Sequence, residues 1–336
     1  MRPLDRIRSI KTKLSIVIVA AVAVTAATST VGFRLGVPLW LGPIISASLA
    51  LLMVQFLAHG MTRPLRAMAS AAPSMARGDY GLRVHTTAVD EVGRLAEAFN
   101  HMAAELAETD RQRRDLVANV SHELRTPISA LQATLENLVD GVAAPDSATF
   151  RAMHTQTERL GRLVRDLLDL SRLESGATQL RLERILLHDL LTRAIDESRL
   201  HHPDLGVTVE VLPDEIAFEC DPDRLHQAIV NLLDNAVRYG GANAFVRIEA
   251  RCRHRCLRVD ISDNGPGIPA GERGRVFERF YRADHAPAAH RGGAGLGLAI
   301  VRSIVELHNG VIRAEGNDPR GCRMVIELPD RQEQAA

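Results

Sequence analysis

Residues 121–127 read Ser-His-Glu-Leu-Arg-Thr-Pro and lie inside a repeat of apolar residues that runs from 116 to 139. The spacing of three and four predicts an amphipathic helix and leaves His122 outside the apolar stripe, on the solvent side. A second amphipathic segment spans 147–174, with apolar positions at Phe150, Met153, Leu160, Val164 and Leu167. Two helices joined by a short loop form a hairpin, and two hairpins make a four-helix bundle.

His122 is the residue of this heptapeptide with the chemistry to react. Thr126 lies four positions further along and therefore shares its helix face. Glu123 is adjacent and can bias the imidazole tautomer or accept its proton. Pro127 removes a backbone hydrogen bond at a cost of about 3 kcal/mol, so packing around a kink must compensate. A histidine alone would be an ordinary surface residue, since the chain has 13, but these neighbours make His122 a candidate catalytic residue.

Two apolar runs near the N-terminus lack charged side chains, at 14–33 and at 35–58. About 20 helical residues span roughly 30 Å, the thickness of a bilayer core. The runs predict transmembrane helices at 14–33 and 39–58 rather than buried helices of a soluble protein. Basic residues precede the first run and follow the second, which predicts that both ends are cytoplasmic and that 34–38 form a short external turn. A cleaved signal peptide is the alternative for the first run, whose length favours retention.

The composition excludes several classes of protein. Lys and Arg number 41 and Asp and Glu 41, so a net charge of zero argues against nucleic-acid binding through bulk positive charge. Hydrophobic residues make up 46% of the chain, which excludes general disorder. The four cysteines are too few and too scattered for a disulfide scaffold. Cys252, His254 and Cys256 alternate in a predicted strand at 245–261 and would share a face. A zinc site needs a fourth ligand, so reduced cysteines are expected.

From Met61 onward the apolar residues follow a heptad-like rhythm in two short seams. The seams consist of Leu65, Met68, Ala72 and Met75, then Val92, Leu95, Phe99, Met102 and Leu106. Seams this short bury too little surface alone, which predicts a partner helix, most simply from a second copy of the chain. Pro64 and residues 90–93 (Asp-Glu-Val-Gly) resemble a HAMP linker, the helical signal relay that follows membrane spans. A generic coiled coil is the alternative.

A helix predicted around 229–239 carries polar residues on one face. Asn231, Asn235 and Arg238 are spaced i, i+4 and i+7, while Ile229, Leu232, Leu233 and Ala236 form the packed side. Neutral amides beside a guanidinium suit Mg²⁺ whose charge is already balanced by phosphates. Asp234 also lies near this face and is a weaker candidate ligand. A pair of asparagines alone would be a solvated surface, so this candidate depends on the blocks that follow.

Two glycine-containing blocks follow. In the first, Asp263 closes a predicted strand and can accept an amino proton from a base edge, while Gly265 and Gly267 let the backbone approach a planar ligand. The second block, 293–298, opens a helix, where backbone N–H groups and the helix dipole hold phosphate. It does not fit a dinucleotide fold, because no βαβ pattern precedes it and the acidic residue usual after a Rossmann turn is missing.

Taken in order, the blocks that begin near His122, Asn231, Asp263, Phe277 and Gly293 resemble the H, N, G1, F and G2 boxes of two-component sensor histidine kinases. The resemblance covers essentially the whole chain. It implies that His122 is the phosphoacceptor, Glu123 its acid–base partner, and Thr126 a residue that positions water when the partner is dephosphorylated. Asn231 and Asn235 would bind Mg²⁺ and ATP. The other implied nucleotide contacts are Arg238 (phosphates), Tyr239, Asp263 (adenine), Gly265, Gly267, Ile268, Gly293, Gly295, Leu296, Gly297 and Leu298.

Two departures from the family pattern are present. The segment 284–291, the expected ATP lid, lacks the Ser-Arg often found early in it, so Arg282, His290 or Arg291 is expected to supply the charge. Cys322 stands where many relatives have threonine, which weakens the hydroxyl contact expected there.

The implied fold is that of a multi-domain membrane protein with an α+β ATP-binding sandwich of the Bergerat (GHKL) type. The expected parts are a cytoplasmic N-terminus (1–13), transmembrane helices (14–33 and 39–58) around an external turn (34–38), a helical HAMP relay (59–111), a dimerisation and phosphotransfer domain that forms a four-helix bundle in the dimer (112–176), and a catalytic ATP-binding domain (177–331).

The implied activity is that of an ATP-dependent protein-histidine kinase in a bacterial inner membrane, with both termini cytoplasmic. It would phosphorylate His122 from Mg-ATP, pass the phosphoryl group to an aspartate of a separate response regulator, and dephosphorylate that regulator. The expected partners are a second copy of the chain and membrane lipid. Because the external turn is too short for a sensor domain, sensing is expected within the membrane, through the spans, or through a sensory membrane partner. Nucleic acid is not expected. The alternative is a nucleotide-binding membrane receptor or scaffold without kinase activity.

Overall fold

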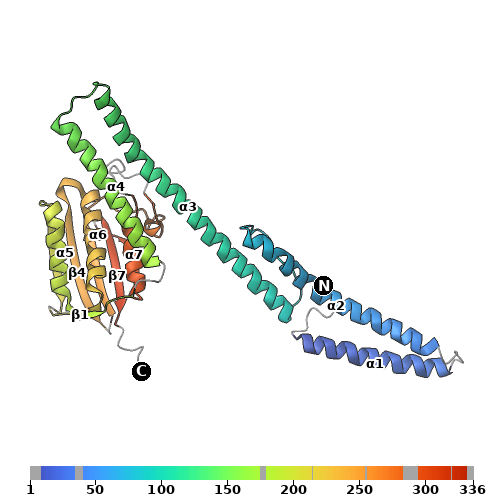
Figure 1. The fold of residues 1–336 in the computed structure, drawn as a ribbon. Helices are drawn as coiled ribbons and strands as arrows, with labels where there is room; N and C mark the ends of the chain where they lie inside the picture. The colour runs from blue at the N-terminus through green and yellow to red at the C-terminus, as the bar shows by residue number, and fades with distance from the viewer. Residues whose placement is uncertain are drawn as a thin grey trace. The chain divides into compact units, whose positions relative to one another are not determined.

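The computed structural model describes residues 9–34, 41–174, 179–213, 215–253, 256–282, 294–318 and 320–330. The chain divides into two compact units, residues 1–118 and residues 119–336. Figure 1 shows the long helices of the first unit and the sheet with its covering helices in the second.

The first unit begins with helices α1 (Ile10–Arg34) and α2 (Leu41–Ala76), which pack against each other. Within α1, Ile10–Thr28 has the length and hydropathy of a membrane span, and it is the one such segment among the residues that the structure describes. The hydroxyl oxygens of Thr28 and Ser46 lie 2.5 Å apart and join α1 to α2. The second predicted span lies in α2 from Leu41 onward, and residues 35–38 of the predicted external turn lie outside the described residues.

Asp90 caps the N-terminus of α3 (Glu91–Val139). Its Oδ1 accepts hydrogen bonds from the backbone N–H groups of Val92 (3.0 Å) and Gly93 (3.1 Å), as N-cap aspartates do. Its Oδ2 lies 2.5 Å from Nζ of Lys13, and the two side chains are only 2% and 5% exposed. Burial alone would raise the pKa of Asp90, but the hydrogen bond from Lys13, the N–H of Gly93 and the charge of Lys13 outweigh it and lower the pKa. The start of α1 is thereby tied to the start of α3.

The connector between α2 and α3 is held by Asn100. Its Oδ1 accepts from the N–H of Val84 and its Nδ2 donates to the carbonyl of Val84, both at 2.9 Å. Val84 is thus fixed in a small buried cluster with Met68 and Ala96. A side chain at position 93 would place its Cβ 1.9 Å from the carbonyl oxygen of Ala88, which explains the glycine there.

The predicted seams account for part of the packing in the first unit. Met68, Met75 and Val92 are buried, together with the alanines Ala71, Ala96 and Ala103. The other seam positions Leu65, Leu95, Met102 and Leu106 are exposed in the single chain, and the partner helix expected to cover them stays a prediction.

The second unit contains the predicted helical hairpin, formed by the rest of α3 and by α4 (Ser147–Glu174). Asp146 caps α4 by accepting hydrogen bonds from the N–H groups of Thr149 (2.8 Å) and Ala148 (3.1 Å). The predicted extent of this helix is therefore confirmed. Its buried residues differ from the predicted stripe: Leu163, Leu170 and Leu173 join the core of the second unit, whereas Phe150 and Val164 are exposed.

A five-stranded sheet in the order β2-β4-β5-β7-β6 forms the body of the second unit. Strands β2 and β4 pair in parallel, and the other neighbours in the sheet, over the residues that the structure describes, pair antiparallel. The strands are β2 (Gly206–Leu212), β4 (Phe245–Arg253), β5 (Cys256–Asp263), β6 (Val311–Gly316) and β7 (Cys322–Pro329), and a separate pair is formed by β1 (Glu183–Leu186) and β3 (Ala217–Cys220). The helices are α5 (Leu187–His201), α6 (Pro222–Gly240) and α7 (Gly297–Leu307).

The sheet is covered by helices on one face. In β4, Val246, Ile248 and Ala250 are fully buried, while the alternate residues Arg247 and Arg251 are exposed. This alternation is that of a half-buried sheet. Figure 1 shows α5, α6 and α7 in front of the strands, and the predicted α+β sandwich is confirmed.

The prediction of a single strand at 245–261 is wrong. These residues belong to two antiparallel strands, β4 and β5, and residues 254–255 between the strands lie outside the described residues. Cys252 follows the buried residues of β4 and contacts the core, whereas Cys256 shares the outer face of β5 with Arg258 and Asp260. The two cysteines therefore lie on opposite faces. Both are free thiols.

Candidate active site

Helix α6 presents the predicted polar face to a cavity. Asp221 accepts a hydrogen bond from the N–H of Arg224 (3.0 Å) and caps the helix, and Pro222 occupies its first turn. The predicted packed side is confirmed, because Ile229, Leu232, Leu233 and Ala236 are buried. Asn231, Asn235 and Arg238 line the cavity from the opposite face, together with Asp234 and Tyr239.

Asp263, at the end of β5, is held by the backbone. Its Oδ1 accepts hydrogen bonds from the N–H groups of Gly265 (2.9 Å) and Cys322 (3.0 Å). Burial raises the pKa of the carboxyl, although these two hydrogen bonds lower it in part. Gly321 has a φ of +124°, and a Cβ there would lie 1.9 Å from the carbonyl oxygen of Asp263. Only glycine fits at this position.

Cys322 acts through its main chain. Its N–H, rather than its side chain, contacts Asp263, so this contact does not need the threonine of the family pattern. Burial raises the pKa of its thiol to about 12, which keeps the thiol protonated at neutral pH.

The glycine block before α7 forms another wall. Gly295 has a φ of +71°, and a Cβ there would lie 2.8 Å from the carbonyl oxygen of Tyr281. Gly297 begins α7. Gly295, Leu296, Gly297 and Leu298 all line the cavity. Gly293 and the lid residues His290 and Arg291 lie outside the described residues, whereas Arg282 lines the cavity.

The cavity has two compartments. The first, of about 520 Å³, contains Asp263, Gly267, Ile268 and Cys322 and has a volume typical of small-molecule sites. The second contains Asn231, Arg238 and residues 295–297. The residues common to both are Asn235, Tyr239, Val276, Tyr281, Arg282 and Leu298. A ligand held at Asp263 can therefore extend past Asn235 into the second compartment.

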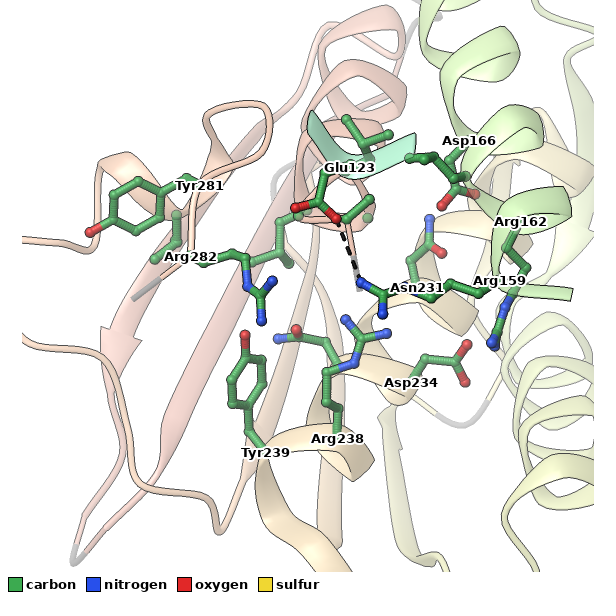
Figure 2. A pocket seen from close by; sticks show the side chains of 18 of the residues that line it. Glu123, Arg159, Arg162, Asp166, Asn231, Asp234, Arg238, Tyr239, Tyr281 and Arg282 are labelled. Atoms are coloured by element: carbon green, nitrogen blue, oxygen red, sulfur yellow. Dashed lines mark ion pairs between the residues drawn. The ribbon is translucent and has the colours of Figure 1, made fainter. Parts of the chain in front are cut away.

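The far wall of the second compartment comes from the helical hairpin. Figure 2 shows Glu123 of α3 facing Arg159, Arg162 and Asp166 of α4 across the cavity from α6. Nη2 of Arg159 lies 3.6 Å from Oε2 of Glu123. The sequence prediction missed all three α4 residues. Their spacing of three and four along one helix was the available signal, but it does not show which element that face meets.

His122 and Thr126 are exposed, as predicted, and Thr126 Oγ1 lies 3.4 Å from the carbonyl oxygen of His122. Neither lines the cavity, whereas Glu123 and Pro127, on the neighbouring helix face, do. The structure thus brings Glu123 together with the predicted nucleotide residues and leaves His122 outside this group. Gly265 acts indirectly, through Asp263.

Asn231 fits the predicted metal role. Its Nδ2 is buried and has no hydrogen-bond partner among the described residues. The orientation of an amide is assigned from its partners, so either amide atom can face the cavity. A buried amide without a partner is costly, and a hydrated cation with phosphates beside Asn231 and Asn235 would satisfy it.

The surroundings of Asp166 disfavour the ionised form of its carboxyl group. Burial and the charge of Asp169 raise its pKa to about 6, against the opposing effects of Arg165, Arg162 and Arg238. An unfolded aspartate titrates near 3.8. The protonated carboxyl therefore contributes stability that is fully present below about pH 4 and is lost as the pH rises through 6.

We expect the substitution Asp166→Asn to raise the melting temperature of the detergent-solubilised protein at pH 7.5 by about 2–4 °C. It removes a charge penalty of about 1 kcal/mol, allowing for partial exposure. At pH 4.5 the native carboxyl is protonated but most of the unfolded carboxyl is still ionised, so the gain should fall to about a third of its value at pH 7.5. Asp140→Asn, at an exposed position, is the control and should show no such pH dependence. An equal gain at both pH values would contradict the assignment.

Comparison with known proteins identifies three families of domain. Residues 56–108 match the HAMP domain, 112–176 the His Kinase A (phospho-acceptor) domain, and 220–332 the ATPase domain of histidine kinases, DNA gyrase B and HSP90. The chain is 36% identical over 291 residues to the signal transduction histidine-protein kinase BaeS of Escherichia coli, covering 86% of this chain and 62% of BaeS.

One further relative and one solved structure support the same family. The histidine-protein kinase/phosphatase MprB of Mycolicibacterium smegmatis is 35% identical over 313 residues, which cover 89% of this chain and 62% of MprB. The chain thus spans about three fifths of the length of these relatives. The solved structure of Acinetobacter baumannii histidine kinase AdeS superposes with a TM-score of 0.53 at 30% identity, covering 62% of this chain and 98% of AdeS. The chain belongs to the two-component sensor histidine kinases.

Proposed function

We propose that the protein is an ATP-dependent protein-histidine kinase, which phosphorylates His122 from Mg-ATP and passes the phosphoryl group to an aspartate of a response regulator. The observation that carries the proposal is the cavity that extends from Asp263, through Asn235, to Glu123 beside His122.

The chemistry follows from the residues along this cavity. Asp263 accepts the amino proton of adenine, and Arg238 with the N-terminus of α7 holds the phosphates. An imidazole nitrogen of His122 attacks the γ-phosphorus in line, so that a P–N bond forms while the bond to the bridging oxygen of ADP breaks. Glu123 accepts the imidazole proton. Mg²⁺ near Asn231 and Asn235 would neutralise phosphate charge.

His122 does not line the cavity, so this attack requires a movement of the catalytic domain against the helical hairpin, or the histidine of a second copy. The exposed apolar residues of α3, Leu95, Met102 and Leu106, support a homodimer, because a partner helix would bury them.

The proposed location is a bacterial inner membrane, with lipid around spans at 14–33 and 39–58 and both termini in the cytoplasm. The ion pair of Lys13 with Asp90 supports this orientation and the retention of the first span, since it brings the residue before that span to the start of α3. The stimulus would reach the kinase through the spans or through a sensory membrane partner.

Phosphatase activity toward the regulator is proposed as well. Thr126 lies one helical turn from His122, where its hydroxyl can position water. The name of the relative MprB, a kinase/phosphatase, supports the same pairing of activities.

Labelling tests the proposal. The full chain in detergent micelles, incubated with Mg²⁺ and radiolabelled ATP, is expected to take up label in a bond that is stable in alkali and labile in acid, as a phosphoramidate is. EDTA should prevent the labelling, and the label should pass to a purified cognate regulator. A protein that binds ATP but takes up no label would be a nucleotide-binding receptor or scaffold, and the proposal would be wrong.

A further inference from the structure

Arg159 and Glu123 form an ion pair on the far wall of the second compartment (Figure 2). The two side chains are 29% and 20% exposed, so the pair is largely shielded from water. Its N–O distance of 3.6 Å exceeds that of a hydrogen bond. The pair is therefore an electrostatic contact without hydrogen-bond geometry, which a better anion can displace.

The order of groups along ATP decides which part of it meets this pair. With adenine at Asp263 in the first compartment, the phosphates pass the shared residue Asn235 and enter the second compartment. The phosphate farthest from adenine then comes nearest to the wall formed by α3 and α4. ADP lacks that phosphate and ends short of the wall.

The second compartment attracts a multiply charged anion. Its lining contains the guanidinium groups of Arg159, Arg162, Arg238 and Arg282, against the carboxyl groups of Glu123, Asp166 and Asp234. A terminal phosphate offers Arg159 more charge than one carboxylate, and the planar guanidinium can bind it through two hydrogen bonds.

We infer that Arg159 is a positioning residue that pairs with Glu123 when the cavity is empty and with the terminal phosphate when ATP is bound. Its transfer releases Glu123 to serve His122, so the acid–base partner becomes available only when a phosphoryl donor is present. The inference rests on the proposed ATP site. It adds a residue of α4 that distinguishes ATP from ADP.

The substitution Arg159→Gln tests the contact with phosphate. Displacement of a fluorescent nucleotide from the full chain in micelles, with Mg²⁺, gives the affinities for ATP and ADP. We expect R159Q to weaken ATP binding about tenfold and to change ADP binding less than about twofold, as loss of one charged contact implies. R165Q is the matched control, since Arg165 is an exposed arginine of the same helix that does not line the second compartment, and it should leave the affinities for both nucleotides unchanged. An equal effect of R159Q on both nucleotides, or on neither, would overturn the inference.

The substitution Glu123→Gln tests the exchange of partners. Without the carboxylate, Arg159 is available to phosphate from the start, so E123Q should bind ATP several-fold more tightly than the wild type and ADP equally well. The double variant E123Q/R159Q should match R159Q, because the gain acts through Arg159. Unchanged or weaker ATP binding by E123Q would overturn the inference about Arg159 but would leave the ATP site standing. A wild-type protein that binds neither nucleotide would overturn the ATP site, and the inference with it.

Discussion

His122→Gln is expected to reduce the uptake of label from radiolabelled ATP to background. Glutamine has a similar polarity, but its amide nitrogen is not nucleophilic, so no P–N bond can form. The loss should be confined to the chemical step. His122 is exposed and does not line the cavity, so the variant should fold and bind ATP as the wild type does.

The control is His154→Gln. His154 is an exposed histidine of the same helical hairpin, with its Nδ1 3.7 Å from Oε2 of Glu158, and it should be dispensable. This variant should label like the wild type. If His122→Gln kept its label, the phosphoacceptor would lie elsewhere in the chain.

Asp263→Asn is expected to weaken ATP binding about a hundredfold, which corresponds to the loss of nearly 3 kcal/mol from one buried, charged hydrogen bond. The amide keeps an oxygen for the N–H groups of Gly265 and Cys322, so the turn should remain folded. Its NH₂ group, however, would face the amino group of adenine with a donor in place of an acceptor.

The same substitution should change base preference. Guanine carries a carbonyl where adenine carries its amino group, so the asparagine variant should lose its discrimination against GTP. Competition between ATP and GTP measures this directly. Asp260→Asn is the control, because Asp260 lies on the same strand but pairs with Arg258 on the outer face. A variant of Asp263 that kept both its affinity and its preference for ATP would exclude adenine from this position.

The polar face of α6 could be predicted from the sequence because the helical period alone determines which residues share a face. Asn231, Asn235 and Arg238 stand opposite four buried apolar residues, and nothing distant is needed to orient them. The far wall of the cavity could not be predicted in this way. Arg159 and Asp166 reach it only because Leu163 and Leu170 of α4 pack into the core of the second unit, a long-range contact that leaves no local pattern.

The hairpin of β4 and β5 was missed although the sequence contained its signal. The buried positions of β4 are 246, 248 and 250, whereas those of β5 are 257, 259 and 261, so the alternation changes from even to odd between the strands. A regular strand keeps one phase along its length unless a β-bulge interrupts it. Cys252 and Cys256 have the same parity and for that reason point to opposite faces.

The ion pair between Lys13 and Asp90 joins residues 77 positions apart in sequence. Helix α1 is therefore attached to α3 twice, once along the polypeptide through α2 and once through a side-chain tether. A displacement of α1 along its axis can pull on the first turn of α3 without bending α2. Because Asp90 also caps that turn, the contact with Lys13 acts on the same side chain that satisfies two free backbone N–H groups at the start of α3.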